Sequence, residues 1–149
     1  MTVRGIGIDV VDLQRFAEQL DLVGSRYRSA FTAGERELVR QPAGGDAQLR
    51  EHEHLAARWA AKEAFIKAWS SARHGAAPRL DRIDPREIEV RLDAWGRPGL
   101  RLHGNVAEGI TATLGPTALH VSLSHDGGTV VALVVIESIG TSVDGNVAA

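Results

Sequence analysis

The stretch LAARWAAKEAFIKAW, from Leu55 to Trp69, decides the fold of this chain of 149 residues. It lies in a run from Leu49 to His74 that contains no glycine or proline and is rich in alanine, leucine, glutamate, arginine and lysine. These residues favour helices, and a glycine commonly follows the last helical residue. The pattern predicts one long helix that ends at Gly75 and serves as the scaffold of the molecule.

Charged side chains interrupt the apolar residues of this helix, so that it has no continuous polar face. Glu63 and Lys67 lie one turn apart on one edge, and Arg58 and Lys62 form a second pair on the other side. All these charges border surface that is expected to be buried. The helix pattern alone leaves two interpretations open: charge pairs and long side chains that support a core helix, or the polar groups of a functional site.

Shorter elements flank the long helix on both sides. Their order predicts an α+β fold in which a β-sheet packs against a long central helix, with additional helices. The domain is expected to cover residues 1–137, followed by a disordered tail over residues 138–149. The expected elements are a buried strand Val3–Asp9, a helix from Asp12 to Gly24, a helix from Thr32 to about Arg40 opened by a Thr32–Glu35 capping box, a flexible connection at residues 41–46, a hairpin of strands at residues 88–92 and 100–102, a helix Asn105–Leu114, and strands Leu119–Ser124 and Val130–Glu137.

The composition excludes several functional classes. Without cysteine there is no disulfide, thiolate zinc site, iron–sulfur cluster or cysteine nucleophile, and a reducing, cytoplasmic compartment is expected. We expect neither secretion nor a membrane span, because the first residues show no signal-peptide pattern and the longest apolar run, Val130–Ile136, is far shorter than about 20 residues. The net charge of −2 argues against general nucleic-acid binding.

Two carboxylates are candidate metal ligands. Asp9 ends a strand, and Glu63 lies on a mostly buried helix. Mg²⁺ prefers one or two carboxylates, keeps several waters and takes its remaining ligands from phosphate oxygens. The lysines beside these carboxylates indicate a polyphosphate ligand. The alternative for Asp9 is a structural role as the polar end of its strand.

Five segments together resemble one family. In order and spacing, they are similar to the holo-[acyl-carrier-protein] synthases, the small class of 4′-phosphopantetheinyl transferases. The resemblance spans Gly5 to about Glu137, and the combination of motifs is far more specific than any one of them. The segments are GIGIDVVDLQRF (Gly5–Phe16), FTAGE (Phe31–Glu35), RWAAKEAFIKAW (Arg58–Trp69), DAWGRP (Asp93–Pro98) and HVSLSHDGG (His120–Gly128).

The resemblance implies an activity and a set of catalytic residues. The phosphopantetheine arm of coenzyme A is moved to a serine of an apo acyl carrier protein or carrier domain in fatty acid biosynthesis, and adenosine 3′,5′-bisphosphate is released. Asp9 and Glu63 are then the Mg²⁺ ligands, and Lys67 acts on the pyrophosphate. Glu63, directly or through a metal-bound water, is the candidate that deprotonates the acceptor serine.

The resemblance also implies the residues that bind the substrates. Arg58 and Lys62 correspond to positions near the nucleotide phosphates, with helix-surface charge as the alternative. His120 and Ser122, and less directly His125, lie on or after a strand that borders the nucleotide site, often across a subunit boundary; packed or hydrogen-bonded side chains are the alternative. The family implies a homotrimer with sites between subunits. Arg15 is expected to dock the acidic carrier protein, within a basic strip that includes Arg26, Arg28 and Arg36; plain surface charge is the alternative, and it is the favoured one for Arg26 and Arg28.

Two other functions remain alternatives at this level. One is an Mg²⁺-dependent phosphohydrolase that uses the same two carboxylates, although more carboxylates around its metals are expected. The other is a non-catalytic module that binds coenzyme A, against which Asp9, Glu63 and Lys67 argue. The sequence His52-Glu53-His54 lacks the HExxH spacing and is interpreted as solvated.

Overall fold

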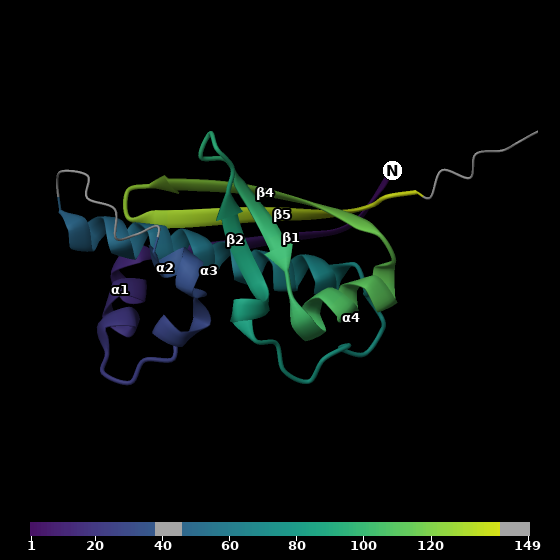
Figure 1. Cartoon of the computed structure of the whole chain (residues 1–149), viewed down its shortest axis with the longest axis horizontal. Coiled ribbons are helices and arrows are strands. Elements are labelled where there is room, and N and C mark those ends of the chain that lie inside the picture. Colours follow the sequence, from purple (N-terminus) through teal and green to yellow (C-terminus); the bar gives the residue numbers. More distant parts are fainter. Residues whose placement is uncertain (38–45, 141–149) are drawn as a thin grey trace, which may run out of the picture.

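A computed structural model describes residues 1–37 and 46–140 of the chain. Two antiparallel sheets and one long helix make up its frame, which confirms the α+β prediction (Figure 1). The elements in chain order are β1 (Thr2–Asp12), α1 (Leu13–Asp21), the short 3₁₀-helix η1 (Arg28–Ala30), α2 (Ala33–Glu37), α3 (Ala47–Ser71), the 3₁₀-helix η3 (Pro85–Glu87), β2 (Ile88–Leu92), β3 (Pro98–Leu102), α4 (Gly104–Leu114), β4 (Thr117–Asp126) and β5 (Thr129–Ser138).

Helix α3 is the predicted scaffold, with small changes at its ends. It begins at Ala47 because the Asp46 side chain accepts hydrogen bonds from the first backbone N–H groups. It ends at Ser71, three residues before His74, because the chain tightens there into a turn in which the N–H of Arg73 donates to the carbonyl of Ser70. Of the predicted connection at residues 41–46 and the predicted tail at residues 138–149, residues 41–45 and 141–149 lie outside the described residues, whereas Asp46 caps α3 and Ser138 is the last residue of β5.

The larger sheet has the strand order β1-β5-β4, so strands from opposite ends of the sequence lie side by side (Figure 1). The register pairs Ile8 of β1 with Leu133 of β5, and Leu133 with Ser122 of β4. Strands β4 and β5 are joined by Gly127-Gly128, both with positive φ, as a tight hairpin turn requires. The smaller sheet is the hairpin of β2 and β3, whose tip reaches past β4 (Figure 1).

Strand β1 lies directly on α3 because two of its residues lack side chains. A Cβ added at Gly7 would come within 2.0 Å of the Ala64 carbonyl oxygen, and one at Gly5 within 2.1 Å of that of Ala68. The alanines that face them are fully buried. This close contact fixes the part of β1 that carries Asp9 against the part of α3 that carries Glu63.

The other face of the sheet is open in the single chain, which corrects the prediction that the first strand is buried. Ile6, Ile8 and Val10 alternate with the residues that face α3, and they are 57%, 54% and 60% exposed. Leu133 of the neighbouring β5 shares their face. Within the described residues, no helix is long and apolar enough to cross a membrane.

Candidate active site

Asp9, Glu63 and Lys67 meet where β1 crosses α3, and we call these three residues the acidic group. The Lys67 ammonium lies 2.7 Å from Asp9 Oδ1 and donates a second hydrogen bond, of 3.1 Å, to the Ile8 carbonyl. Asp9 is largely buried, whereas Lys67 is about half exposed. An open depression of about 430 Å³ has Asp9 and Glu63 in its wall. A ligand therefore has access to both carboxylates.

Within the acidic group, Glu63 has a raised pKa. Burial raises the pKa of Glu63 above its ordinary value, the nearby Asp9 carboxylate raises it further, and Lys67 partly opposes both. Two neighbouring carboxylates with one cation nearby keep excess negative charge, which favours an added proton or an added cation. Glu63 therefore has the properties of a proton acceptor or a metal ligand.

The donor set fits Mg²⁺ rather than a closed protein-only metal site. Among residues 1–37 and 46–140, no three histidine, aspartate or glutamate side chains gather around one point. Two carboxylates that face an open depression leave coordination positions for water and phosphate oxygens, which is the usual arrangement for Mg²⁺ in proteins. Asp9 and Glu63 are thus suited to a metal that is shared with a phosphate ligand.

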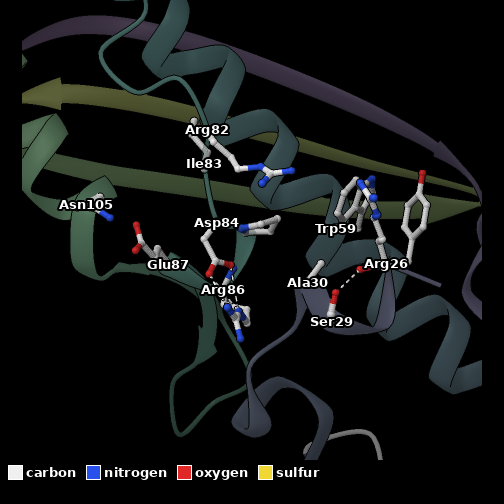
Figure 2. Close-up of a pocket in the computed structure, with 12 residues that line it drawn as sticks. Arg26, Ser29, Ala30, Trp59, Arg82, Ile83, Asp84, Arg86, Glu87 and Asn105 are labelled. Atoms are coloured by element: carbon white, nitrogen blue, oxygen red, sulfur yellow. Dashed lines mark hydrogen bonds and ion pairs between the residues drawn. The ribbon is translucent and has the colours of Figure 1, made fainter. Parts of the chain in front are cut away.

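A larger cleft of about 790 Å³ adjoins this depression (Figure 2). Tyr27 and Trp59, with ring centroids 4.8 Å apart, line both cavities and so connect them. Figure 2 shows Arg26, Ala30 and Trp59 on one side of the cleft and the segment around η3 on the other. The size is typical of a small-molecule site. The sequence indicated neither aromatic residue as part of a site; Trp59 lies in a helical pattern, where aromatics usually belong to the core, and Tyr27 lies outside the predicted elements.

Arg15 lies in the wall of the same depression as Asp9 and Glu63. Its position on α1 follows from the cap at Asp12, whose side chain accepts from the Arg15 N–H. The other arginines of the predicted basic strip have different surroundings. Arg26 lines the larger cleft, and Arg28 is bound to Asp21 and Glu51.

Arg58 is buried to an unusual degree for an arginine. One of its Nη atoms donates to the His54 carbonyl at 3.0 Å, whereas its Nε and the other Nη have no hydrogen-bond partner among the described residues. Burial lowers the pKa of Arg58, and the Glu35 carboxylate opposes this effect. A buried guanidinium with free donors is suited to an incoming anion.

Lys62 requires a correction, because the structure does not bring it to the acidic group or to the surface. Its side chain is fully buried, and its ammonium donates to Glu35 Oε2 at 3.0 Å and to the carbonyls of Pro85 and Ile88. Burial lowers the pKa of Lys62, against the opposing effect of Glu35. All three donors of the ammonium are used, so none remains for a nucleotide phosphate.

His120 and Ser122 lie on the opposite face of the sheet from Asp9. His120 pairs with Val135, which in turn pairs with the exposed Ile6, and residues directly opposite one another share a face. Asp9 pairs instead with Ala132, which is buried. Within one chain the two groups therefore do not meet. His120 is exposed and lies 3.1 Å from Glu137.

His52 differs from the prediction that the segment His52-Glu53-His54 is solvated, whereas His54 is exposed as predicted. His52 is 8% exposed, and its Nε2 lies 3.1 Å from Asp21 Oδ2, so it connects α3 to α1. Burial lowers the pKa of His54, and Arg58 and His125 lower it further. His125 is exposed and lies near the end of β4, opposite Val130 of β5.

Comparisons with known proteins agree with this arrangement. Residues 5–133 match the family model described as the 4′-phosphopantetheinyl transferase superfamily. The holo-[acyl-carrier-protein] synthase of Mycobacterium tuberculosis is 44% identical over 138 residues, which cover 93% of this chain and 99% of that protein. A Mycobacterium sp. (strain KMS) protein of the same name is 46% identical over 137 residues, which cover 92% of this chain and 98% of that protein.

Two solved structures are similar as well. The "ACPS-CoA complex" of Chronobacterium ammoniagenes has a TM-score of 0.82 and 40% identity, and the match covers 91% of this chain and 98% of that one. A holo-(acyl-carrier-protein) synthase from Bacillus anthracis in complex with CoA (3′,5′-ADP) has a TM-score of 0.66 and 31% identity, with 93% and 100% covered. Together with the matching family model, these likenesses show that the chain belongs to the 4′-phosphopantetheinyl transferase superfamily, among the holo-[acyl-carrier-protein] synthases.

Proposed function

We propose that this protein transfers 4′-phosphopantetheine from coenzyme A to a serine of an apo acyl carrier protein and releases adenosine 3′,5′-bisphosphate. The observation that carries the proposal is the acidic group, in which Lys67 pairs with Asp9 and the carboxylates of Asp9 and Glu63 lie in the wall of an open depression. The names of the relatives and their complexes with coenzyme A support it. The setting that we propose is fatty acid biosynthesis in the cytoplasm, with residues 1–137 as the catalytic domain.

Asp9 and Glu63 are the residues that would hold Mg²⁺. Bound there, the metal would neutralise charge on the pyrophosphate of coenzyme A. The nearby Asp9 carboxylate, which adds to the effect of burial in raising the pKa of Glu63, supports this assignment.

The chemical step is a phosphoryl-type transfer. A bond forms between the serine oxygen and the phosphorus that carries the pantetheine arm, and the bond from this phosphorus to the leaving nucleotide breaks. Glu63, directly or through a water held by the metal, would accept the serine proton. Lys67 donates hydrogen bonds to pyrophosphate oxygens and so stabilises the charge on the leaving group.

The nucleotide end of coenzyme A is assigned to Arg58, His120 and Ser122. Arg58 offers buried donors without partners among the described residues. His120 and Ser122 would act from a neighbouring copy, because they lie on the opposite face of the sheet from Asp9. A homotrimer with sites between subunits would satisfy this requirement, and the apolar face that includes Ile8 supports such contacts.

The carrier protein is expected to dock beside Arg15. This arginine lies in the same depression as the acidic group, so a serine on a docked partner comes close to Glu63. Such a cation attracts an acidic partner, and its main effect is to raise the rate of association.

The decisive experiment incubates the protein with coenzyme A, Mg²⁺ and an apo acyl carrier protein and weighs the carrier. The proposed function requires a mass gain of one phosphopantetheine, its loss when a chelator removes Mg²⁺, and its near-complete loss in Asp9→Asn and Glu63→Gln. Circular dichroism of both variants controls for folding. A carrier that keeps its mass with several apo carriers would contradict the transferase activity, and normal rates in either variant would contradict the metal assignment.

A further inference from the structure

Lys62 and Glu35 form a buried ion pair next to the candidate site without belonging to it. Lys62 comes directly before Glu63 on α3, yet its side chain is fully buried and lies 3.0 Å from Glu35 Oε2. The Phe31 ring is also close, with its centroid 5.7 Å from the ammonium. The remaining contacts of this pair show what it holds together.

The contacts of Lys62 connect α3 to both ends of η3. Its ammonium donates to the carbonyl of Pro85, the first residue of η3, at 2.9 Å, and to the carbonyl of Ile88, the first residue after it. The cation thus bridges the two ends of one short turn. Since every donor of the ammonium has a partner, this turn has a fixed position relative to α3.

Glu35 connects the same unit to β2 and α2. Its Oε1 accepts from the Val90 N–H at 2.9 Å, and its Oε2 accepts from the Thr32 N–H at 2.9 Å in the capping box of α2. The carboxylate therefore has a partner at each oxygen besides Lys62. One buried pair holds four elements, α2, α3, η3 and β2, in one arrangement.

The position of η3 matters because it forms one side of the cleft in Figure 2. Asp84, Pro85, Arg86 and Glu87 line this side, and Trp59 lines the other, one turn before Lys62 and Glu63 on the same helix. The width of the cleft beside the acidic group therefore depends on the distance between η3 and α3. Lys62 bonds α3 directly to both ends of η3.

Stability alone does not account for a buried pair of this kind. Well-packed apolar residues of similar volume often stabilise a core as well as a buried ion pair does, or better. Apolar contacts fix the relative position of two elements less well than hydrogen bonds do, because a hydrogen bond joins one particular donor to one particular acceptor.

We infer that Lys62 and Glu35 are positioning residues that hold the η3 side of the cleft at a fixed distance from Trp59 and Glu63, so that the substrates bind in register with the acidic group. This inference rests on the proposed transferase function. Both side chains are fully buried and their polar atoms are bound within the protein, so the effect of the pair is expected on substrate binding rather than on the chemical step.

The test compares the double variant Lys62→Met/Glu35→Gln with the unaltered protein in steady-state transfer from coenzyme A to an apo acyl carrier protein. The double variant removes both charges together, and the amide that replaces the Glu35 carboxylate keeps an acceptor oxygen. We expect a folded protein whose KM for coenzyme A or for the carrier rises about tenfold, with kcat within about threefold of the unaltered value. Thr113→Val is the control, because it removes the acceptor of the 3.0 Å hydrogen bond from Trp69 between α3 and α4. It should lower the melting temperature without changing either KM.

Each outcome decides the inference. If the unaltered protein transfers nothing, the proposed function fails. If it is active and the folded double variant keeps both KM values, whether or not kcat falls, the positioning role is overturned. If the double variant does not fold, the single variant Glu35→Gln decides. A folded Glu35→Gln with a raised KM supports the inference, whereas unaltered KM values overturn it. Failure of both variants to fold also overturns it, because the pair then serves the fold itself.

Discussion

At Gly7 the backbone of β1 lies so close to α3 that a single methyl group has no room. Its Cβ would come within 2.0 Å of the Ala64 carbonyl oxygen, and backbone atoms on both sides prevent an easy adjustment. We expect Gly7→Ala to lower the free energy of unfolding by about 3 kcal/mol. Urea denaturation measures it. Gly99→Ala on β3 is the control, because its Cβ would meet nothing nearer than 3.9 Å; equal losses in both variants would contradict the close contact.

Lys67 offers a test of the acidic group that leaves the fold intact. Its side chain is about half exposed, so its ion pair with Asp9 contributes little to stability. Lys67→Met is expected to lower kcat about 100-fold or more, because the charge on the leaving group loses a donor, while the melting temperature changes little. A kcat near that of the unaltered protein would remove Lys67 from the chemistry.

Glu89 links stability to pH. Burial alone would raise its pKa, but hydrogen bonds from His103 and Thr32 and the charge of Arg91 outweigh burial and lower the pKa below the ordinary 4.5. A carboxylate with a lowered pKa in the folded state stabilises the fold above pH 4.5, and this contribution is lost as the pH falls through the folded-state pKa. The difference in melting temperature between the unaltered protein and Glu89→Gln should therefore be largest near neutral pH and shrink below pH 4.5. A constant difference would contradict this linkage.

At the scale of elements, α1 places Arg15 beside the acidic group and so carries the expected docking contact. Arg15→Glu is expected to raise the KM for the carrier protein about tenfold, with little change in the KM for coenzyme A, because the charge reversal repels an acidic partner. The effect should weaken as salt is added. Arg101→Glu, the same change at an exposed position of β3, serves as control. A similar rise in both variants would show a general charge effect.

The order and type of the elements could be predicted because their signals are local. The caps at Asp12 and Thr32 and the uninterrupted run around α3 lie within a few residues of the structures that they specify. The grouping of Asp9, Glu63 and Lys67 followed from the resemblance, and the structure brings these residues together.

The role of Lys62 could not be predicted from such local signals. A lysine in a helical pattern is usually exposed, and its partner Glu35 lies on another element. The same holds for His52, whose partner Asp21 lies on α1. Nor could the alternation in β1 show that one of its faces stays open, because two of the buried positions are glycines, whereas the branched side chains of Ile6, Ile8 and Val10 lie on the exposed face.

At the scale of the whole molecule, the open sheet face predicts association. Leu133 lies on this face and is 39% exposed in the single chain. Leu133→Glu is expected to convert an assembly of three 16.0 kDa chains into single chains and to lower activity together with it, since His120 and Ser122 would no longer reach a neighbouring site. Sedimentation measures the mass. Leu92→Glu on β2 is the control, because Leu92 is equally exposed and lies on the other sheet. A single-chain mass for the unaltered protein would contradict the assembly.

The pairing of β1 with β5 has a consequence for biosynthesis. Thr2 lies opposite Ser138, so the first strand of the sheet depends on the last one for all its hydrogen bonds within the sheet. During translation β1 leaves the ribosome long before β5 exists, and its apolar side chains then have no partner strand. Contacts between such distant segments slow folding and expose the chain to aggregation. The sheet therefore forms only after the central strand β5, residues 129–138, has emerged. Chaperone binding to the unfinished chain is an expected stage in its production.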